Sequence, residues 1–172
     1  MPPTRVLLAA AALLAGCSSG PSPAPSAEAP SFRLATVDGA SEMALADAVR
    51  AAGGKPLVLV LGSHDCPYST QEVEELATSK PDYAVVAVVQ GTPQQVKASL
   101  PAAVPFPVLV DAAGATLGLY AVEATPSVVV LDGKGGMAYR GPGGYIPPAR
   151  IAEMAARVAR GEPPGEVAPE GG

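Results

Sequence analysis

The spacing of apolar residues changes several times along the chain, and each change predicts a different element. Two continuous apolar runs, Pro56–Gly62 (PLVLVLG) and Tyr83–Gln90 (YAVVAVVQ), are typical of central strands that are buried on both faces. Shorter segments of near alternation or apolar character predict four further strands. These are Ser31–Asp38, Pro105–Asp111, Ser127–Asp132 and Met137–Gly141, the last two joined by a glycine-rich hairpin turn.

Helical patterns alternate with these strands. The predicted helices are Glu42–Ala52, a segment that follows Cys66 and runs to about Lys80, Thr92–Leu100, a turn after Asp111, and Pro147–Arg160. The third of these has Thr92 as its N-cap and Pro93 at its first position. Strands that alternate with helices and end in a hairpin and a helix predict an α/β domain, with a central mixed β-sheet flanked by helices.

The N-terminus has the pattern of an export signal. Arg5 precedes the apolar run Val6–Ala15, which is too short to span a bilayer, since that needs about 20 residues. Leu14–Cys17 (LAGC) resembles the lipobox of bacterial lipoproteins. That resemblance implies a signal peptide over residues 1–16 and a lipidated, palmitate-bearing Cys17 at the mature N-terminus. The alternative is an ordinary secretory signal in which Cys17 carries no lipid.

Two terminal segments lack any periodic apolar pattern. Residues 17–31, rich in Ser, Pro and Ala, are expected to form a disordered tether after the lipidated cysteine, and residues 161–172 a disordered tail. The folded domain is then 32–160. We expect it in the cell envelope, anchored to a membrane and facing the periplasm or the exterior. Ser18 resembles the signal for release toward an outer membrane, in a cell that has one.

Composition and cysteine count narrow the chemistry. The chain has 172 residues, of which 48% are hydrophobic and 16% charged, as in a globular protein. Its net charge is -5 and it has no run of Lys or Arg, so nucleic acid is not an expected partner. Of the two cysteines, only Cys66 remains a thiol if Cys17 carries lipid. No internal disulfide could then form, and any redox cycle would need a second molecule.

The order of the motifs resembles the thioredoxin-like superfamily. A buried strand leads through a loop into Cys66–Ser69 (CPYS) and a helix, and Ala124–Gly135 (ATPSVVVLDGKG) follows far downstream. The likeness is to membrane-tethered thiol-disulfide oxidoreductases and to the alkyl hydroperoxide reductase and peroxiredoxin branch. It implies a thioredoxin-like fold over nearly all of 32–160. It also implies a reactive cysteine at the start of the first long helix, which maps to Cys66, and a cis-proline facing it, which maps to Thr125-Pro126.

The chain also departs from that family. Ser69 stands where the family has its resolving cysteine, and Asp65 replaces the tryptophan that often precedes the nucleophile. The central strand lacks the acidic residue often found there, whereas Glu72 matches an acidic position common in the tethered branch. The fold assignment does not depend on these positions, but a dithiol mechanism does.

A cysteine at a helix N-terminus is expected to be reactive, because backbone N–H groups and the helix dipole stabilise its thiolate. Ser69 can donate a hydrogen bond to that thiolate in place of the resolving cysteine. Asp65 would raise the pKa of Cys66 if its carboxylate pointed toward the sulfur, and His64 as an imidazolium would offset this. The alternatives are a buried inert Cys66, a solvated His64, a Ser69 that only packs, and a trans Pro126.

Three functions remain open. The first is exchange through a single thiol, in which Cys66 forms a mixed disulfide with a protein disulfide or a low-molecular-weight thiol, and an external thiol reductant resolves it. The second is an antioxidant one-cysteine peroxidase acting on hydroperoxides. Ser63 fits the peroxiredoxin pattern three residues before Cys66, but Leu59 stands in place of its proline, and Arg140 is the nearest candidate arginine.

The third is a non-catalytic thioredoxin-fold binding module. A copper metallochaperone would need two cysteines and a distant histidine, whereas this chain offers only His64 and Cys66 in Ser63–Cys66 (SHDC). No zinc ligand set is present in the sequence, so neither metal nor cofactor is expected.

Overall fold

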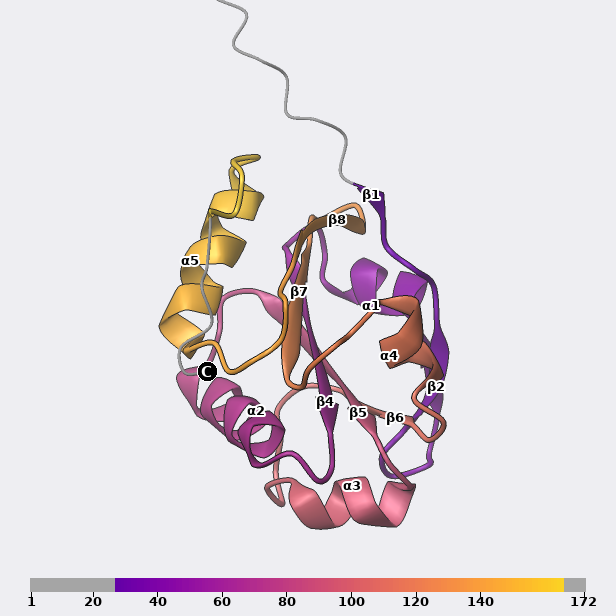
Figure 1. The fold of residues 1–172 in the computed structure, drawn as a ribbon. Helices are drawn as coiled ribbons and strands as arrows, with labels where there is room; N and C mark the ends of the chain where they lie inside the picture. Colours follow the sequence, from indigo (N-terminus) through magenta and orange to yellow (C-terminus); the bar gives the residue numbers. More distant parts are fainter. Residues whose placement is uncertain (1–26, 166–172) are drawn as a thin grey trace, which may run out of the picture.

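The computed structural model describes residues 27–165, which form one mixed eight-stranded sheet with helices on both faces (Figure 1). The strands are β1 (Ala27–Glu28), β2 (Arg33–Thr36), β3 (Glu42–Ala44), β4 (Leu57–Ser63), β5 (Ala84–Gln90), β6 (Val108–Asp111), β7 (Ser127–Leu131) and β8 (Gly136–Arg140). The helices are α1 (Leu45–Ala51), α2 (Pro67–Ser79), α3 (Pro93–Ser99), α4 (Ala115–Leu119) and α5 (Pro148–Ala159). The strand order across the sheet is β1-β8-β7-β4-β5-β6-β2-β3. The α/β class with a thioredoxin-like mixed sheet is confirmed.

Strand β4 lies at the centre of the sheet, parallel to β5 and antiparallel to β7. Its residues alternate between the two faces: Val58 and Val60 pack into one hydrophobic cluster, and Leu57, Leu59 and Leu61 into another. All five side chains are buried, and burying each contributes about 1.5–3 kcal/mol relative to exposure. A strand buried on both faces requires the continuous apolar run seen in the sequence.

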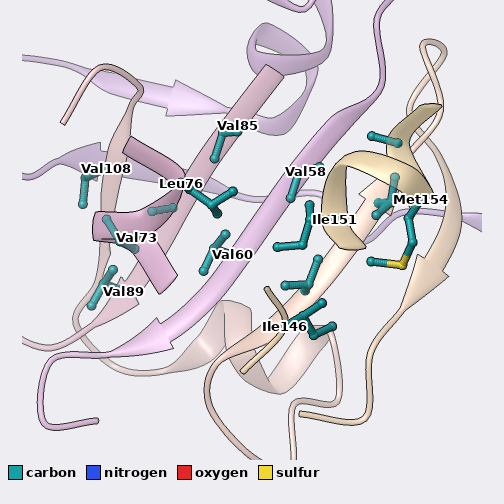
Figure 2. Close-up of a cluster of buried hydrophobic side chains, with 14 of the residues drawn as sticks. Val58, Val60, Val73, Leu76, Val85, Val89, Val108, Ile146, Ile151 and Met154 are labelled. Carbon is teal, nitrogen blue, oxygen red and sulfur yellow. The ribbon is translucent and has the colours of Figure 1, made fainter. Parts of the chain in front are cut away.

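Each face of the sheet has its own helices. Helices α2 and α5 cover the face of Val58 and Val60, where α2 contributes Leu76 and α5 contributes Ile151 and Met154 (Figure 2). Helices α1 and α4 cover the opposite face (Figure 1), with Leu45, Ala48 and Leu117 among their buried residues. The fold is therefore a three-layer arrangement in which α2, the helix after Cys66, is fixed by an apolar core.

The predicted helix over Glu42–Ala52 begins three residues late. Glu42–Ala44 forms the edge strand β3, paired with β2 through contacts such as Leu34 with Met43. Helix α1 starts only at Leu45, and the Asp47 carboxylate accepts a hydrogen bond from the Ala44 N–H at its start. Pairing with a neighbouring strand outweighed the local helical spacing of these residues.

The folded region also begins earlier than the boundary predicted at residue 32. Ala27–Glu28 pairs with β8, Ala29 is buried, and the Tyr120 hydroxyl donates a hydrogen bond of 2.8 Å to the Pro30 carbonyl. The end of the proposed tether is therefore part of the sheet. The proposed signal peptide and Cys17 lie outside the described residues. None of the helices within 27–165 has the length and apolarity needed to cross a membrane.

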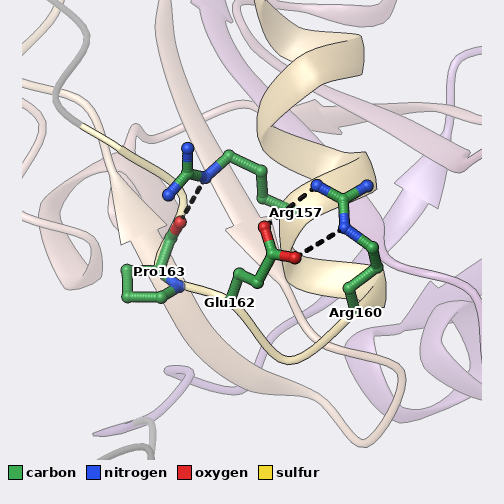
Figure 3. A network of polar contacts seen from close by, with 4 residues as sticks. All are labelled: Arg157, Arg160, Glu162 and Pro163. Atoms are coloured by element: carbon green, nitrogen blue, oxygen red, sulfur yellow. Dashed lines mark hydrogen bonds and ion pairs between the residues drawn. The ribbon is translucent and has the colours of Figure 1, made fainter.

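At the other end, the chain folds back after α5 (Figure 3). The Arg157 Nε donates to the Pro163 carbonyl at 2.7 Å, and the Arg160 Nε donates to Glu162 Oε1 at 2.7 Å (Figure 3). Both contacts are on the surface, where an ion pair such as Arg160–Glu162 contributes about 0–1 kcal/mol. Some residues that we assigned to the tail are thus held against the last helix.

Candidate functional site

Cys66 lies where β4 gives way to α2. It is the N-cap of α2, with extended backbone angles of φ -95° and ψ 110°, and Pro67 is the first helical residue. Its carbonyl accepts the N–H of Ser69 at 3.0 Å, while its own N–H donates to the Ser63 carbonyl at 3.2 Å. Pro67 fits the first turn because no helical acceptor exists there for its missing N–H. The thiol is half-buried, at the positive end of a 13-residue helix.

The downstream Thr-Pro dipeptide faces this thiol. The Thr125-Pro126 peptide bond is cis, as the resemblance implied. The Cys66 thiol donates a hydrogen bond of 3.2 Å to the Thr125 carbonyl oxygen. The two segments meet because β7 begins directly after Pro126 and pairs with β4, with Leu61 opposite Ser127. Sheet pairing therefore places this carbonyl at the same edge as the end of β4.

Ser69 is buried beneath the cysteine, in the position of a resolving thiol. Its Oγ accepts the Ser63 N–H at 3.2 Å, and its side chain is among the groups that lower the pKa of Cys66. Gly62 makes this packing feasible, because a Cβ on Gly62 would lie 2.9 Å from the Ser69 Cβ. The end of β4 and the first turn of α2 are thus fitted together around Ser69.

The environment of Cys66 favours its thiolate. Burial raises the pKa of the Cys66 thiol, but hydrogen bonds from the Ser69 side chain, the Thr125 side chain and the backbone of Ser69 and Tyr68 outweigh it. The pKa of Cys66 is therefore lowered below the ordinary value for a thiol. Thr125 has two effects, because its carbonyl accepts the S–H of the thiol and its side chain is among the groups that lower the pKa of Cys66.

The Asp65 carboxylate is hydrogen-bonded to Ser63. Its Oδ1 accepts a short hydrogen bond from the Ser63 hydroxyl. That bond is the main cause that lowers the pKa of the exposed Asp65 carboxyl. The carboxylate is therefore directed to Ser63.

His64 turns away from the thiol. The backbone N–H of His64 donates to the Gln90 carbonyl at 3.0 Å, and Nδ1 of its ring lies 3.1 Å from the same oxygen. A carbonyl can only accept, so Nδ1 carries the proton in this arrangement. The ring lies against Gly91, where a Cβ would come within 2.8 Å of Nδ1. Of the site residues predicted from the sequence, Ser69, Thr125 and Pro126 are brought to Cys66, and His64 is not.

The residues considered for a peroxidase have other partners for their side chains. Leu59 lies within β4, fully buried and paired with β5 and β7, where a proline would remove a ladder hydrogen bond. The Ser63 hydroxyl is bonded to Asp65. The Arg140 guanidinium donates to the carbonyls of Tyr120 and Ala121, each at 3.0 Å.

Glu72 is a further titratable residue near the site, and its burial could not be read from the sequence. It is fully buried on α2, and neither carboxyl oxygen has a hydrogen-bond partner of good geometry within 27–165. Burial raises the pKa of Glu72 to about 8, the nearby Ile146 N–H partly offsets this, and the charge of Glu75 adds to it. Glu72 is therefore mostly protonated at neutral pH.

The loop between β8 and α5 connects helix α2 to the cis-proline turn. Gly144 donates its N–H to the Pro126 carbonyl at 2.7 Å, and Gly143 packs so closely that a Cβ there would lie 2.6 Å from the Ala124 carbonyl oxygen. The next residue, Tyr145, donates a short hydrogen bond to Glu75 on α2. The only sequence signal for this loop was its glycine content, which does not identify a contact partner.

The described residues offer little to a metal ion. No group of three or more His, Cys, Asp or Glu side chains within 27–165 is arranged to hold one, and Cys66 is the free cysteine of that region. The chemistry that the site does support is that of a half-exposed thiol with a lowered pKa and a serine in the resolving position.

Comparison with known proteins gives a family and several similar structures. Residues 25–140 match the AhpC/TSA family. No match is found among curated protein sequences. An uncharacterised conserved protein from Geobacillus kaustophilus is 20% identical, with a TM-score of 0.66 over 86% of this chain and 88% of that one.

Two further similar structures have described activities. The pneumococcal exposed lipoprotein thioredoxin Etrx1 from Streptococcus pneumoniae is 25% identical, with a TM-score of 0.60 over 74% of this chain and 99% of that one. A secreted disulfide oxidoreductase from Mycobacterium tuberculosis, homologous to Escherichia coli DsbE, is 20% identical, with a TM-score of 0.58 over 75% of this chain and 95% of that one. Together these structures establish the thioredoxin-like fold.

Proposed function

The chain belongs to the AhpC/TSA family, and from this premise we propose that it is an envelope thiol-disulfide oxidoreductase that acts through Cys66 alone. The observation that carries the proposal is the pairing of a half-exposed, hydrogen-bonded Cys66 thiol with a buried serine in the resolving position. Such a thiol can attack a disulfide, but Ser69 cannot complete the reaction.

The proposed cycle has two exchange steps. The Cys66 thiolate attacks one sulfur of a substrate disulfide, forming a mixed disulfide and releasing the other half as a thiolate, which takes up a proton. An external thiol then attacks the mixed disulfide as its thiolate and leaves bonded to the substrate sulfur, which regenerates the Cys66 thiolate. Ser69 assists by donating its hydroxyl hydrogen bond whenever Cys66 is ionised.

The geometry favours exchange over peroxide reduction. A hydroperoxide must be held and its departing oxygen stabilised beside the sulfur, and the three residues considered for this have other partners. The Ser63 hydroxyl is hydrogen-bonded to Asp65, and the Arg140 guanidinium is hydrogen-bonded to the backbone at the end of α4. Leu59 is buried in the core. The backbone carbonyl of Thr125, in contrast, is hydrogen-bonded to the Cys66 thiol, so the cis-proline turn lies where a disulfide partner would approach.

The proposed envelope location is supported by the N-terminal sequence and by two of the similar structures. The Leu14–Cys17 motif fits lipidation at Cys17, and the similar structures include an exposed lipoprotein and a secreted oxidoreductase. We expect labelled palmitate to be incorporated into the chain expressed in bacteria and lost in Cys17→Ala. Secretion of an unlipidated wild-type chain would contradict the anchor.

The activity is tested with the Cys17→Ser chain, in which Cys66 is the only thiol. We expect bis(2-hydroxyethyl) disulfide to add one mercaptoethanol to Cys66 by intact mass, a reductant to remove it, and Cys66→Ser to show neither change. In parallel, hydrogen peroxide with a dimedone trap reports sulfenic acid. Fast trapping without exchange would support the peroxidase instead, and the absence of both reactions would leave the binding module.

A further inference from the structure

Residues 141–147, the loop between β8 and α5, contact the cis-proline turn through backbone that favours glycine. The Gly144 N–H donates to the Pro126 carbonyl at 2.7 Å. Gly143 and Gly144 have φ angles of 106° and 103°, and a Cβ on Gly143 would lie 2.6 Å from the Ala124 carbonyl oxygen. There is no room for a side chain between the loop and the turn, so a displacement of the loop changes the position of the turn.

The same loop is attached to α2 by a side chain. Tyr145 donates a short hydrogen bond to Glu75 Oε2, and Gln71 donates to Oε1 of the same carboxylate at 2.9 Å. The bond from Tyr145 is the main cause that lowers the pKa of the Glu75 carboxyl, so the acceptor is ionised at neutral pH. Hydrogen bonds to ionised acceptors are the stronger kind. The next residue, Ile146, is buried in the core on the face that α2 covers (Figure 2).

These contacts form a closed ring that includes the thiol. Cys66 is the N-cap of α2, and Glu75 lies on the same helix. From Glu75 the ring passes through Tyr145 and its loop to the Pro126 carbonyl. It closes at the preceding residue, Thr125, whose carbonyl accepts the Cys66 S–H at 3.2 Å. Tyr145 therefore joins the helix that carries the thiol to the turn that faces it.

We propose that Tyr145 and Glu75 are positioning residues for Cys66: their hydrogen bond holds the cis-proline turn where the Thr125 carbonyl accepts the S–H of the thiol. Both residues act through the loop and the turn, and the bonds that form and break in exchange stay those already described. The position of the turn concerns the thiol whether or not it exchanges, whereas the effect on the rate of exchange rests on the proposed function.

The S–H stretching band of Cys66 tests this arrangement with no need for exchange. In the Cys17→Ser chain Cys66 is the only thiol, and its band lies in a region of the infrared spectrum free of other protein bands. A hydrogen bond to a carbonyl lowers the frequency of this band. Spectra are recorded at about pH 6, between the ordinary pKa values of a glutamate and a thiol. We expect Tyr145→Phe to move the band to higher frequency, because the turn is no longer held against the thiol.

Tyr139→Phe is the matched control. Tyr139 lies on β8, and its buried hydroxyl has no hydrogen-bond partner within the part of the chain that the structure describes. The two variants remove the same atom, but only Tyr145→Phe breaks a bond to α2. We expect Tyr139→Phe to leave the S–H band where it is in the parent chain. An unchanged band in Tyr145→Phe, or an equal shift in both variants, would overturn the proposal.

Rates at Cys66 separate positioning from a change in ionisation. Above the pKa of Cys66, we compare exchange with bis(2-hydroxyethyl) disulfide against alkylation by iodoacetamide in the same chain. A disulfide has to align three sulfur atoms beside the turn, whereas iodoacetamide needs only access to the thiolate. Misplacement by about 1 Å can slow a reaction by about 100-fold, so we expect a loosened turn to lower the ratio of exchange to alkylation by about threefold to tenfold. Tyr139→Phe should keep the parent ratio.

The acceptor is tested from α2. Glu75→Gln keeps an oxygen that can accept from Tyr145 and should retain most of the ratio, whereas Glu75→Leu should lower it as Tyr145→Phe does. Tyr145→Phe/Glu75→Leu should be no slower than either single variant, because both changes remove one bond. Additive losses would refute the positioning role and leave the exchange function standing. Absence of exchange in the parent chain would instead refute the proposed function, and the S–H band would still decide whether Tyr145 positions the turn.

Discussion

The carbonyl oxygen of Thr125 lies 3.2 Å from the sulfur of Cys66, across 59 residues of sequence. This oxygen can accept the S–H of the thiol but cannot stabilise the thiolate, so ionisation must depend on other donors. The side chains of Ser69 and Thr125 and the first backbone amides of α2 supply them. The reactivity of Cys66 is thus a balance between one acceptor and several donors, and single substitutions can shift it.

Ser69→Ala should raise the pKa of Cys66, because it removes the hydroxyl donor to the thiolate. The thiolate fraction at neutral pH then falls, and alkylation by iodoacetamide slows there but not at high pH. The Ser63 N–H also loses its acceptor, which costs about 1–3 kcal/mol of folding stability. The measurement is the pH profile of alkylation. Thr70→Ala, one residue later on α2, serves as the control, and an identical profile for both variants would contradict a role for Ser69.

Gly62→Ala should destabilise the fold through a single contact. The new Cβ would lie 2.9 Å from the Ser69 Cβ and 3.0 Å from its Oγ, so α2 or β4 has to shift. Overpacking of this kind costs about 1–3 kcal/mol, which denaturant unfolding resolves. Gly118→Ala is the matched control, since nothing lies within 4 Å of its added Cβ and the residue is helical. We expect that variant to be neutral or more stable; equal losses in both would refute the packing argument.

Glu72→Gln should flatten the dependence of stability on pH. Burial raises the pKa of Glu72 from 4.5 to about 8, so between these values the unfolded chain releases a proton that the folded chain keeps. The free energy of unfolding therefore falls as pH rises through this window, by about 1.4 kcal/mol per unit at most, and the loss is absent below it. A glutamine has no such proton, so the free energy of unfolding of the variant should rise relative to that of wild type as pH rises.

Denaturant unfolding at several pH values between about 5 and about 8 tests this, within the window that linkage defines. Glu74→Gln is the control, because Glu74 is exposed on the same helix and its replacement leaves the buried surroundings of Glu72 unchanged. Parallel curves for wild type and Glu72→Gln would show that Glu72 is charged when folded.

The central strands of the fold could be predicted because β4 and β5 are buried on both faces. Such strands need a continuous run of apolar residues, which is visible in the sequence. The segments that were assigned differently are short and at the sheet edges. Glu42–Ala44 and Ala27–Glu28 are strands only through pairing with β2 and β8, and such pairing leaves little trace in two or three residues.

The site could be predicted in part. Cys66, Ser69 and Thr125-Pro126 occupy motif positions, so the resemblance brought them together before any geometry was known. The direction of a side chain is different, because it depends on neighbours distant in sequence. The turn of His64 toward Gln90 and the burial of Glu72 near Ile146 are set by β5 and by the loop after β8, which no local pattern around Cys66 reports.

Ser69→Cys should convert the single-thiol reaction into a two-thiol one. The Ser69 side chain lies near enough to Cys66 to lower its pKa, so we expect a thiol at this position to reach a mixed disulfide on Cys66. Exchange with a small disulfide should then release two thiols per protein and leave an internal disulfide, where the wild-type site releases one and keeps the adduct.

Released thiol and intact mass distinguish the two outcomes in the Cys17→Ser background. Because the sulfur is larger than the hydroxyl and Gly62 borders it closely, some loss of stability is expected, and the fold is checked by thermal unfolding. Thr70→Cys, one position further along α2, provides the control for a second thiol without the contact. If Ser69→Cys folds and still retains the adduct with one thiol released, then Ser69 does not occupy a resolving position, and the single-thiol mechanism loses its structural basis.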